Sequence, residues 1–240
     1  MPTSTTDLHY TGTTATVSTG FLACYCTASA NVTFTSGATG AGNTADSSGT
    51  AESVPAILSR SSTIAISGGT FTGGNNSGDR PAPALTSYHD ASVTISGGAF
   101  AASAPSSGGG SPAALVVAPS AGAISGGTFT GPAAASGSGS PGGAALVLEL
   151  TTNFTISGGT FSGGAGYGGG AQGNCLGISL AAGKRLTISG GTFTGPFVAD
   201  LASGASIYVY SSVSISAPVR PTTGGTYTAS IDGMGNTTYS

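Results

Sequence analysis

A six-residue phrase, Ile-Ser-Gly-Gly-Thr-Phe, recurs along this chain of 240 residues and limits the folds open to it more than any other feature. Four copies, together with one variant that has Ala in place of Thr, occupy residues 66–71, 95–100, 124–129, 156–161 and 188–193. The Ile residues that open them are separated by 29, 29, 32 and 32 residues, and fainter copies lie at 32–37 and 213–216. Self-similarity at a fixed period of roughly 20–50 residues indicates a solenoid, a propeller or an array.

The segment 112–131 shows how one repeat is organised. Its apolar run Ala113–Val117 is short and β-branched, as expected of a buried strand, and a turn of small residues follows. Because side chains alternate along a strand, we expect Ile124 and Phe129 to point inward and their polar neighbours to face water. The Gly-Gly pair between them supplies a bend that residues with a Cβ would resist.

The other repeats follow the same order, which predicts an all-β fold: a right-handed parallel β-helix (solenoid) of about seven coils of 27–32 residues. Equivalent apolar runs stand at Val54–Leu58, Pro83–Leu85, Ala144–Leu150 and Cys175–Leu180. The phrase then builds two ladders, one of Ile66, Ile95, Ile124, Ile156 and Ile188, and one of Phe71, Phe100, Phe129, Phe161 and Phe193. A β-propeller is the alternative, but its blades span roughly 40–50 residues and this chain has no Trp.

We expect three parts along the chain. Residues 1–12 form an N-terminal arm that could anchor the protein, 13–219 form the parallel β-helix, and 220–240 form a C-terminal cap or tail. Solenoid ends need caps because open sheet edges invite pairing with other chains.

Charge is scarce: only 5% of the residues are charged, against about 25% in ordinary globular proteins, and the formal net charge is −3. Since 38% of the residues are hydrophobic and recur in register, the 43 glycines indicate an ordered solenoid rather than a disordered chain. Five basic residues spread along the chain predict no nucleic-acid partner. No apolar run approaches the roughly 18–20 residues of a membrane span, and no signal peptide is seen at the start.

Residues that could carry chemistry are few and scattered. Glycoside hydrolysis needs paired carboxylates, but Glu149, Asp90 and Asp200 occupy different positions relative to the repeated phrase, and only loops could bring Asp79 to Asp90. The cluster Ser87-Tyr88-His89-Asp90 contains the residue types of a catalytic triad, yet neighbours on one strand point to alternating sides. We therefore predict no enzymatic activity, no catalytic, metal or cofactor-binding residues, and no cofactor.

The three cysteines are Cys24, Cys26 and Cys175. Cys24 and Cys175 lie about five repeats apart, near 24 Å at roughly 4.8 Å per strand, too far for a disulfide. Cys24 and Cys26 are too close in sequence for a relaxed bridge. We expect buried or half-buried free thiols, with a bond between subunits as the alternative.

Hydroxyl groups recur on the expected outer surface, where Thr residues flank each Phe of the phrase. The candidate contact residues are these threonines and two tyrosines: Thr70, Thr72, Tyr88, Thr128, Thr130, Thr160, Tyr167, Thr192 and Thr194. Regular rows of Thr on a flat β-helix resemble ice-binding proteins, although Thr is also simply a good residue for a strand surface. Ala99 and Ala101 interrupt the rows.

The phrases Thr-Ile-Ser-Gly-Gly-Thr-Phe at 155–161 and Leu-Thr-Ile-Ser-Gly-Gly at 186–191 resemble repeats of bacterial and phage surface β-helices. These include adhesins, glycan-binding modules, and fibre or capsid decoration proteins of tailed phages. The resemblance covers roughly residues 30–217 and bears on the fold, because function lies in sites grafted onto a fold.

A phage virion component, either a head or tail fibre or a capsid decoration protein, is the function we expect first. Its location would be the virion or the extracellular space, and its arm would contact other virion or surface proteins. An extracellular glycan-binding or adhesin module, with host-surface glycans as partners, is the alternative. An ice-binding protein and a polysaccharide-degrading enzyme are lesser alternatives, and the sequence leaves a homo-oligomer open.

Overall fold

The computed structural model describes residues 7–42, 54–74, 82–88, 90–104, 113–117, 119, 121–135, 139–215, 219–221 and 227–240. These residues form β-strands, turns and extended connections, and no helix is found among them. Short runs of β-branched and aromatic residues bounded by Gly and Ser favour strands of this length. The predicted all-β class is confirmed.

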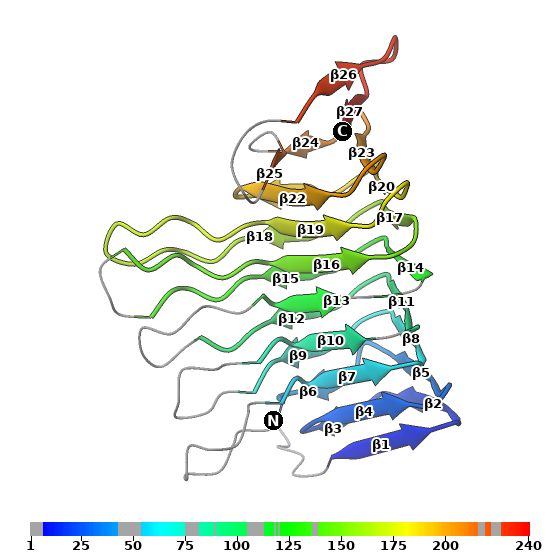
Figure 1. Ribbon diagram of the computed structural model, residues 1–240. Coiled ribbons are helices and arrows are strands. Elements are labelled where there is room, and N and C mark those ends of the chain that lie inside the picture. Colours follow the sequence, from blue (N-terminus) through cyan, green and yellow to red (C-terminus); the bar gives the residue numbers. More distant parts are fainter. Residues whose placement is uncertain are drawn as a thin grey trace.

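Three long sheets, here called A, B and C, contain these strands (Figure 1). Sheet A has the order β1 (Leu8–Thr11), β4 (Cys24–Thr27), β7 (Ile57–Arg60), β10 (Leu85–Tyr88), β13 (Leu115–Val117), β16 (Leu146–Leu150), β19 (Leu176–Leu180), β22 (Phe197–Leu201) and β25 (Arg220–Pro221). Sheet B has the order β2 (Thr14–Val17), β5 (Asn31–Phe34), β8 (Thr63–Ile66), β11 (Ser92–Ile95), β14 (Ala121–Ile124), β17 (Phe154–Ile156), β20 (Arg185–Ile188), β23 (Ser206–Val209), β27 (Thr237–Tyr239) and β26 (Ala229–Ile231). Sheet C has the order β24 (Ser214–Ile215), β21 (Thr192–Thr194), β18 (Thr160–Ser162), β15 (Thr128–Thr130), β12 (Ala99–Ala101), β9 (Thr70–Thr72), β6 (Thr39–Gly40) and β3 (Gly20–Phe21).

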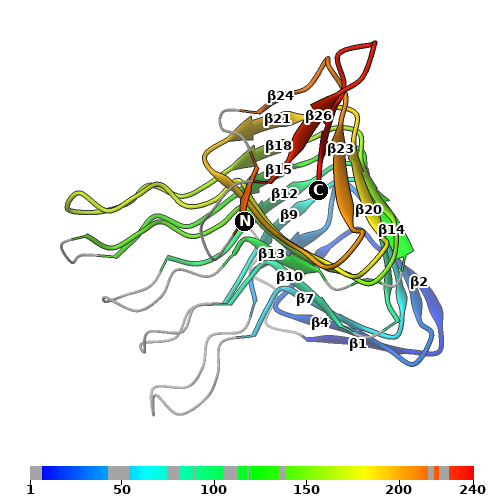
Figure 2. The same ribbon diagram turned by 45° about the horizontal axis from the view of Figure 1, so that its top comes forward.

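Up to β24, every third strand along the chain belongs to the same sheet, so each sequence repeat adds one strand to each sheet (Figure 2). Neighbouring strands are parallel, apart from the antiparallel pairs β23–β27 and β27–β26. The repeated phrase runs in register: its Ile residues pair along sheet B and its Phe residues along sheet C. This arrangement is compatible with the expected β-helix.

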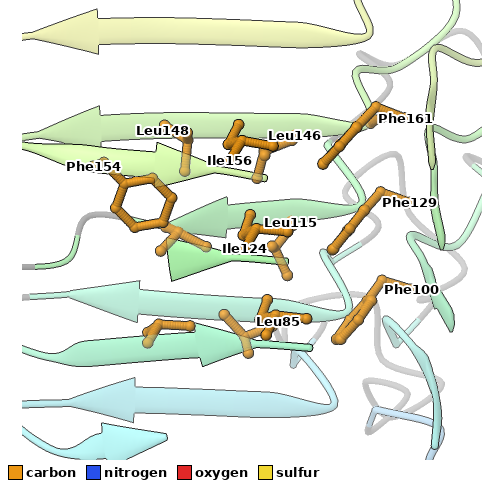
Figure 3. Close-up of a cluster of buried hydrophobic side chains, with 14 of the residues drawn as sticks. Leu85, Phe100, Leu115, Ile124, Phe129, Leu146, Leu148, Phe154, Ile156 and Phe161 are labelled. Atoms are coloured by element: carbon orange, nitrogen blue, oxygen red, sulfur yellow. The ribbon is translucent and has the colours of Figure 1, made fainter. Parts of the chain in front are cut away.

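The inward side chains of all three sheets form one continuous core (Figure 3). Both expected ladders are confirmed, and every member is buried. Ring centroids of successive Phe residues from Phe71 to Phe193 are 5.2, 5.0, 4.8 and 4.9 Å apart, with nearly parallel planes from Phe100 onward. Parallel pairing at one strand spacing imposes this stacking, since equivalent residues lie directly above one another.

The two glycines of the phrase are needed for different reasons. A Cβ on Gly126 would lie 2.3 Å from the carbonyl oxygen of Ser96 in the preceding repeat, and Gly158 has the same contact with Ser125. Gly127 instead adopts a φ of +103°, a conformation that side chains with a Cβ rarely take. The first glycine therefore permits close stacking, and the second makes the bend.

Both ends of the chain join the sheets. Residues 8–11 of the expected N-terminal arm form β1, which pairs with β4 in parallel. Within the expected cap or tail at 220–240, β26 and β27 form an antiparallel hairpin, and β27 pairs with β23 at the end of sheet B. The domain boundaries stay predictions.

Candidate functional site

Two rows of hydroxyl side chains run along the outer face of sheet C. One row contains Thr70, Thr128, Thr160 and Thr192, and the other contains Thr72, Thr130, Ser162 and Thr194, with Ala99 and Ala101 at the level of β12. The seven threonines named here are exposed. Strands stack at roughly 4.8 Å, and residues two apart on a strand lie roughly 6.6 Å apart, so the rows form a regular grid. A role for this grid in binding stays a prediction.

The connections that lead from sheet C to sheet A form a further ordered layer. Residues 131–135, 139–145 and 163–175, here called the connection layer, project together from one side of the sheets (Figures 1 and 2). Backbone hydrogen bonds join one repeat to the next at every third residue: Gly131 to Ser162, Ala134 to Ala165, Gly139 to Gly168, Gly142 to Ala171 and Ala145 to Asn174. A period of three matches the turn of a polyproline II helix, which has no hydrogen bonds of its own and must find them in neighbours.

Glycine allows the layer to pack this closely. A Cβ on Gly163 would lie 1.7 Å from the carbonyl oxygen of Gly173, and one on Gly142 would lie 2.0 Å from that of Gly164. The outgoing and returning parts of a connection are also bonded, as in the 2.8 Å contact from Gly173 N to Gly164 O. The length variation expected here therefore occurs inside a hydrogen-bonded layer.

Tyr167 lies at the outer tip of the longest fully described connection. Its backbone N–H donates to Ser140 O at 3.0 Å, and its own carbonyl accepts from Gly170 N at 2.9 Å, which closes the tip turn. Gly168 and Gly169 take positive φ there, and the Tyr167 side chain is 51% exposed. The layer thus holds an aromatic side chain away from the three sheets.

The residues considered for catalysis are only partly brought together. Ser87 is buried and Tyr88 is exposed, on opposite sides of β10, while His89 and Asp79 lie outside the described residues. Glu149 and Asp200 were expected at unrelated positions, but both pair with Ser179, so they share one outward row two strands apart. That expectation was wrong because Asp200 lies on β22, which follows the last full phrase instead of preceding one. Both carboxylates are exposed.

Metal ligands and membrane-spanning segments were also sought in the described part of the chain. No group of three or more His, Cys, Asp or Glu side chains is close enough there to hold a metal ion. Among the same residues, no helix is long and apolar enough to cross a bilayer.

All three cysteines are free and buried, as expected. The Sγ atoms of Cys24 and Cys26 are 3.7 Å apart, because residues two apart on β4 point to the same side. This contact and burial raise the pKa of the Cys24 thiol, and burial raises the pKa of Cys175 to about 11. Thiols with raised pKa values are poor nucleophiles at neutral pH, which favours a structural role.

Polar contacts concentrate at the C-terminal hairpin. The Asp232 carboxylate accepts hydrogen bonds from Asn236 and from the Tyr208 hydroxyl, which lower its pKa to about 2. The Arg185 guanidinium lies 5.0 Å from the centre of the Tyr208 ring. These contacts fix the hairpin against sheet B, and the sequence gave no repeat-based signal for them.

No protein-family model, curated protein or solved structure significantly matches this chain. Its function is therefore inferred from its own geometry.

Proposed function

We propose that the three sheets are the faces of a right-handed parallel β-helix and that the chain is a non-enzymatic structural protein of a phage virion, a fibre or a capsid decoration protein. The handedness follows from a general rule, since connections between parallel strands of one sheet are right-handed in about 98% of cases. The connection layer carries the functional proposal. Backbone bonds from repeat to repeat hold it at a fixed place on the sheets, a property suited to display and not to turnover.

Three further features support display. The core repeats without a break from Phe71 to Phe193, which makes a stiff support. The outer surface is nearly uncharged, with 5% charged residues, and is rich in hydroxyl groups. The tip of the layer exposes Tyr167. A stiff support with an exposed aromatic tip fits a surface component that contacts a partner.

The test is to locate the chain in particles. Virions are purified from the source culture on a density gradient, and each fraction is examined by quantitative mass spectrometry. We expect the chain to sediment with the major capsid protein, and a tag inserted between Gly168 and Gly169 to be reached by immunogold on intact particles. A chain found only in the soluble fractions would overturn the proposal.

A further inference from the structure

A pocket of about 450 Å³ opens on the outer face of sheet A, at the carboxyl ends of β4, β7 and β10. Thr27, Leu58, Arg60 and Tyr88 line it. Its volume lies in the roughly 300–1,000 Å³ range of small-molecule sites. The pocket therefore has the size of a ligand site and lies on a different sheet from the threonine grid.

Strand register explains how these four side chains meet. Arg60 pairs with Tyr88 across β7 and β10, and Leu58 lies two residues before Arg60 on the same face of β7. Thr27 ends β4, the neighbour of β7 on the other side. Tyr88 is 46% exposed, so its ring remains open to a ligand. Three adjacent strands thus supply an aromatic ring, an aliphatic wall, a guanidinium and a hydroxyl to one opening.

These groups differ in the chemistry they recognise. The Tyr88 ring and the Leu58 side chain offer an apolar wall, against which the C–H face of a ring can lie. The Arg60 guanidinium has five N–H donors in a planar fork, more than one partner occupies, and the fork matches a carboxylate with two parallel bonds. An inorganic anion would not use the apolar wall, and a purely apolar ligand would not use the guanidinium.

We propose that this pocket binds a single sugar ring that carries a carboxylate, of the uronic or sialic acid type. The carboxylate pairs with Arg60, the ring packs on Tyr88 and Leu58, and a ring hydroxyl bonds to Thr27. Only five of the 240 residues are Lys or Arg, so a guanidinium in a pocket is not a background feature of the surface. The site goes beyond the display role and does not depend on it.

The intact chain is titrated with glucuronic acid, galacturonic acid and N-acetylneuraminic acid, and with glucose, galactose and N-acetylglucosamine as neutral counterparts. Calorimetry gives affinities, and saturation-transfer NMR reports which ring protons contact the protein. We expect at least one acidic sugar to bind about tenfold or more tightly than the neutral sugars, a difference typical of one added charge-assisted contact. Added salt should weaken this binding, because an exposed guanidinium is screened.

Variants separate a binding role from a structural one. Arg60→Gln should weaken acidic-sugar binding about tenfold, Arg60→Lys should lie between it and the parent chain, and Tyr88→Thr should remove the ring-proton contacts. Arg185→Gln is the matched control, since this arginine lies over Tyr208 on sheet B, and it should bind like the parent. Far-UV circular dichroism checks that each variant folds.

Three results would overturn the proposal. They are no binding of any acidic sugar by the parent chain, equal affinity for acidic and neutral sugars, and equal losses in the Arg60 and Arg185 variants. If Arg60→Gln fails to fold, Arg60→Lys and the salt dependence of the parent chain still decide the question.

Discussion

The Phe ladder predicts a large and local loss of stability for Phe129→Ala. Phe129 is fully buried, and its ring centroid lies 5.0 Å from that of Phe100 and 4.8 Å from that of Phe161. Removing the buried side chain costs roughly 2–3 kcal/mol of transfer free energy, and each lost ring contact adds about 0.5–1.5 kcal/mol. The sum is about 4 kcal/mol, within the ~3–5 kcal/mol known for Phe→Ala in cores.

Guanidinium unfolding followed by far-UV circular dichroism measures this loss. Thr128→Ala, on the same strand but exposed, is the control and should change the free energy of unfolding by no more than about 0.5 kcal/mol. A repeat array can open in segments, so native-state hydrogen exchange is measured as well. Exchange should accelerate most in β12, β15 and β18, the strands that hold the three rings.

Two outcomes would refute this reasoning. If Phe129→Ala costs no more than Thr128→Ala, the stacked rings do not stabilise the fold. If exchange accelerates equally in β1 and β27, at the two ends of the chain, the repeats are coupled globally and do not stack as neighbouring units. Phe129→Leu keeps apolar volume without the ring and should fall between the alanine variant and the parent chain.

Three other perturbations have definite expected outcomes. Gly126→Ala places a Cβ 2.3 Å from a backbone oxygen and should cost about 1–3 kcal/mol, whereas Gly233→Ala meets no atom within 4 Å and should be near neutral in the same guanidinium titration. Asp232 has its pKa lowered from 3.8 to about 2, so it stabilises the hairpin above pH ~4, and this contribution is lost as the pH falls through about 2. NMR shifts of hairpin amides should follow that loss, and Asp232→Asn should abolish the pH dependence; an unchanged profile would contradict it. Ellman's reagent at pH 8 should leave Cys24 and Cys175 unmodified in the native chain and label them in guanidinium, because both are buried and have raised pKa values; rapid native labelling would contradict it.

The core could be predicted from sequence because each of its positions repeats. Ile124 and Phe129 recur with the same neighbours, so one alternation rule places their equivalents in every repeat, and the register pairs confirm it. The apolar runs also became strands, although β10 begins at Leu85, two residues later than the run from Pro83. Stacking alone sets these positions, which is why periodicity was sufficient.

Features that do not repeat were missed. The strand β22 follows Gly195-Pro196 and has no copy of the phrase after it, so its alignment of Asp200 with Glu149 was invisible. The hairpin of β26 and β27 is antiparallel and depends on Asp232, which occurs once. The connection layer was expected as variable loops because backbone-to-backbone bonds between Gly-rich segments leave no pattern of apolar side chains to read.

The same contrast indicates where function lies in a stacked-repeat protein. A side chain that recurs at one level of every repeat is explained by packing, as the Ile and Phe ladders are. A side chain that departs from its row is not required by the stack. In the outward row that starts at Thr27, Arg60 and Tyr88 follow a small hydroxyl residue with a charge and a ring, and the pocket lies beside them. Stacking gains nothing from either change, since both side chains point away from the core. Their juxtaposition is therefore the feature of this surface that a ligand explains better than the fold does.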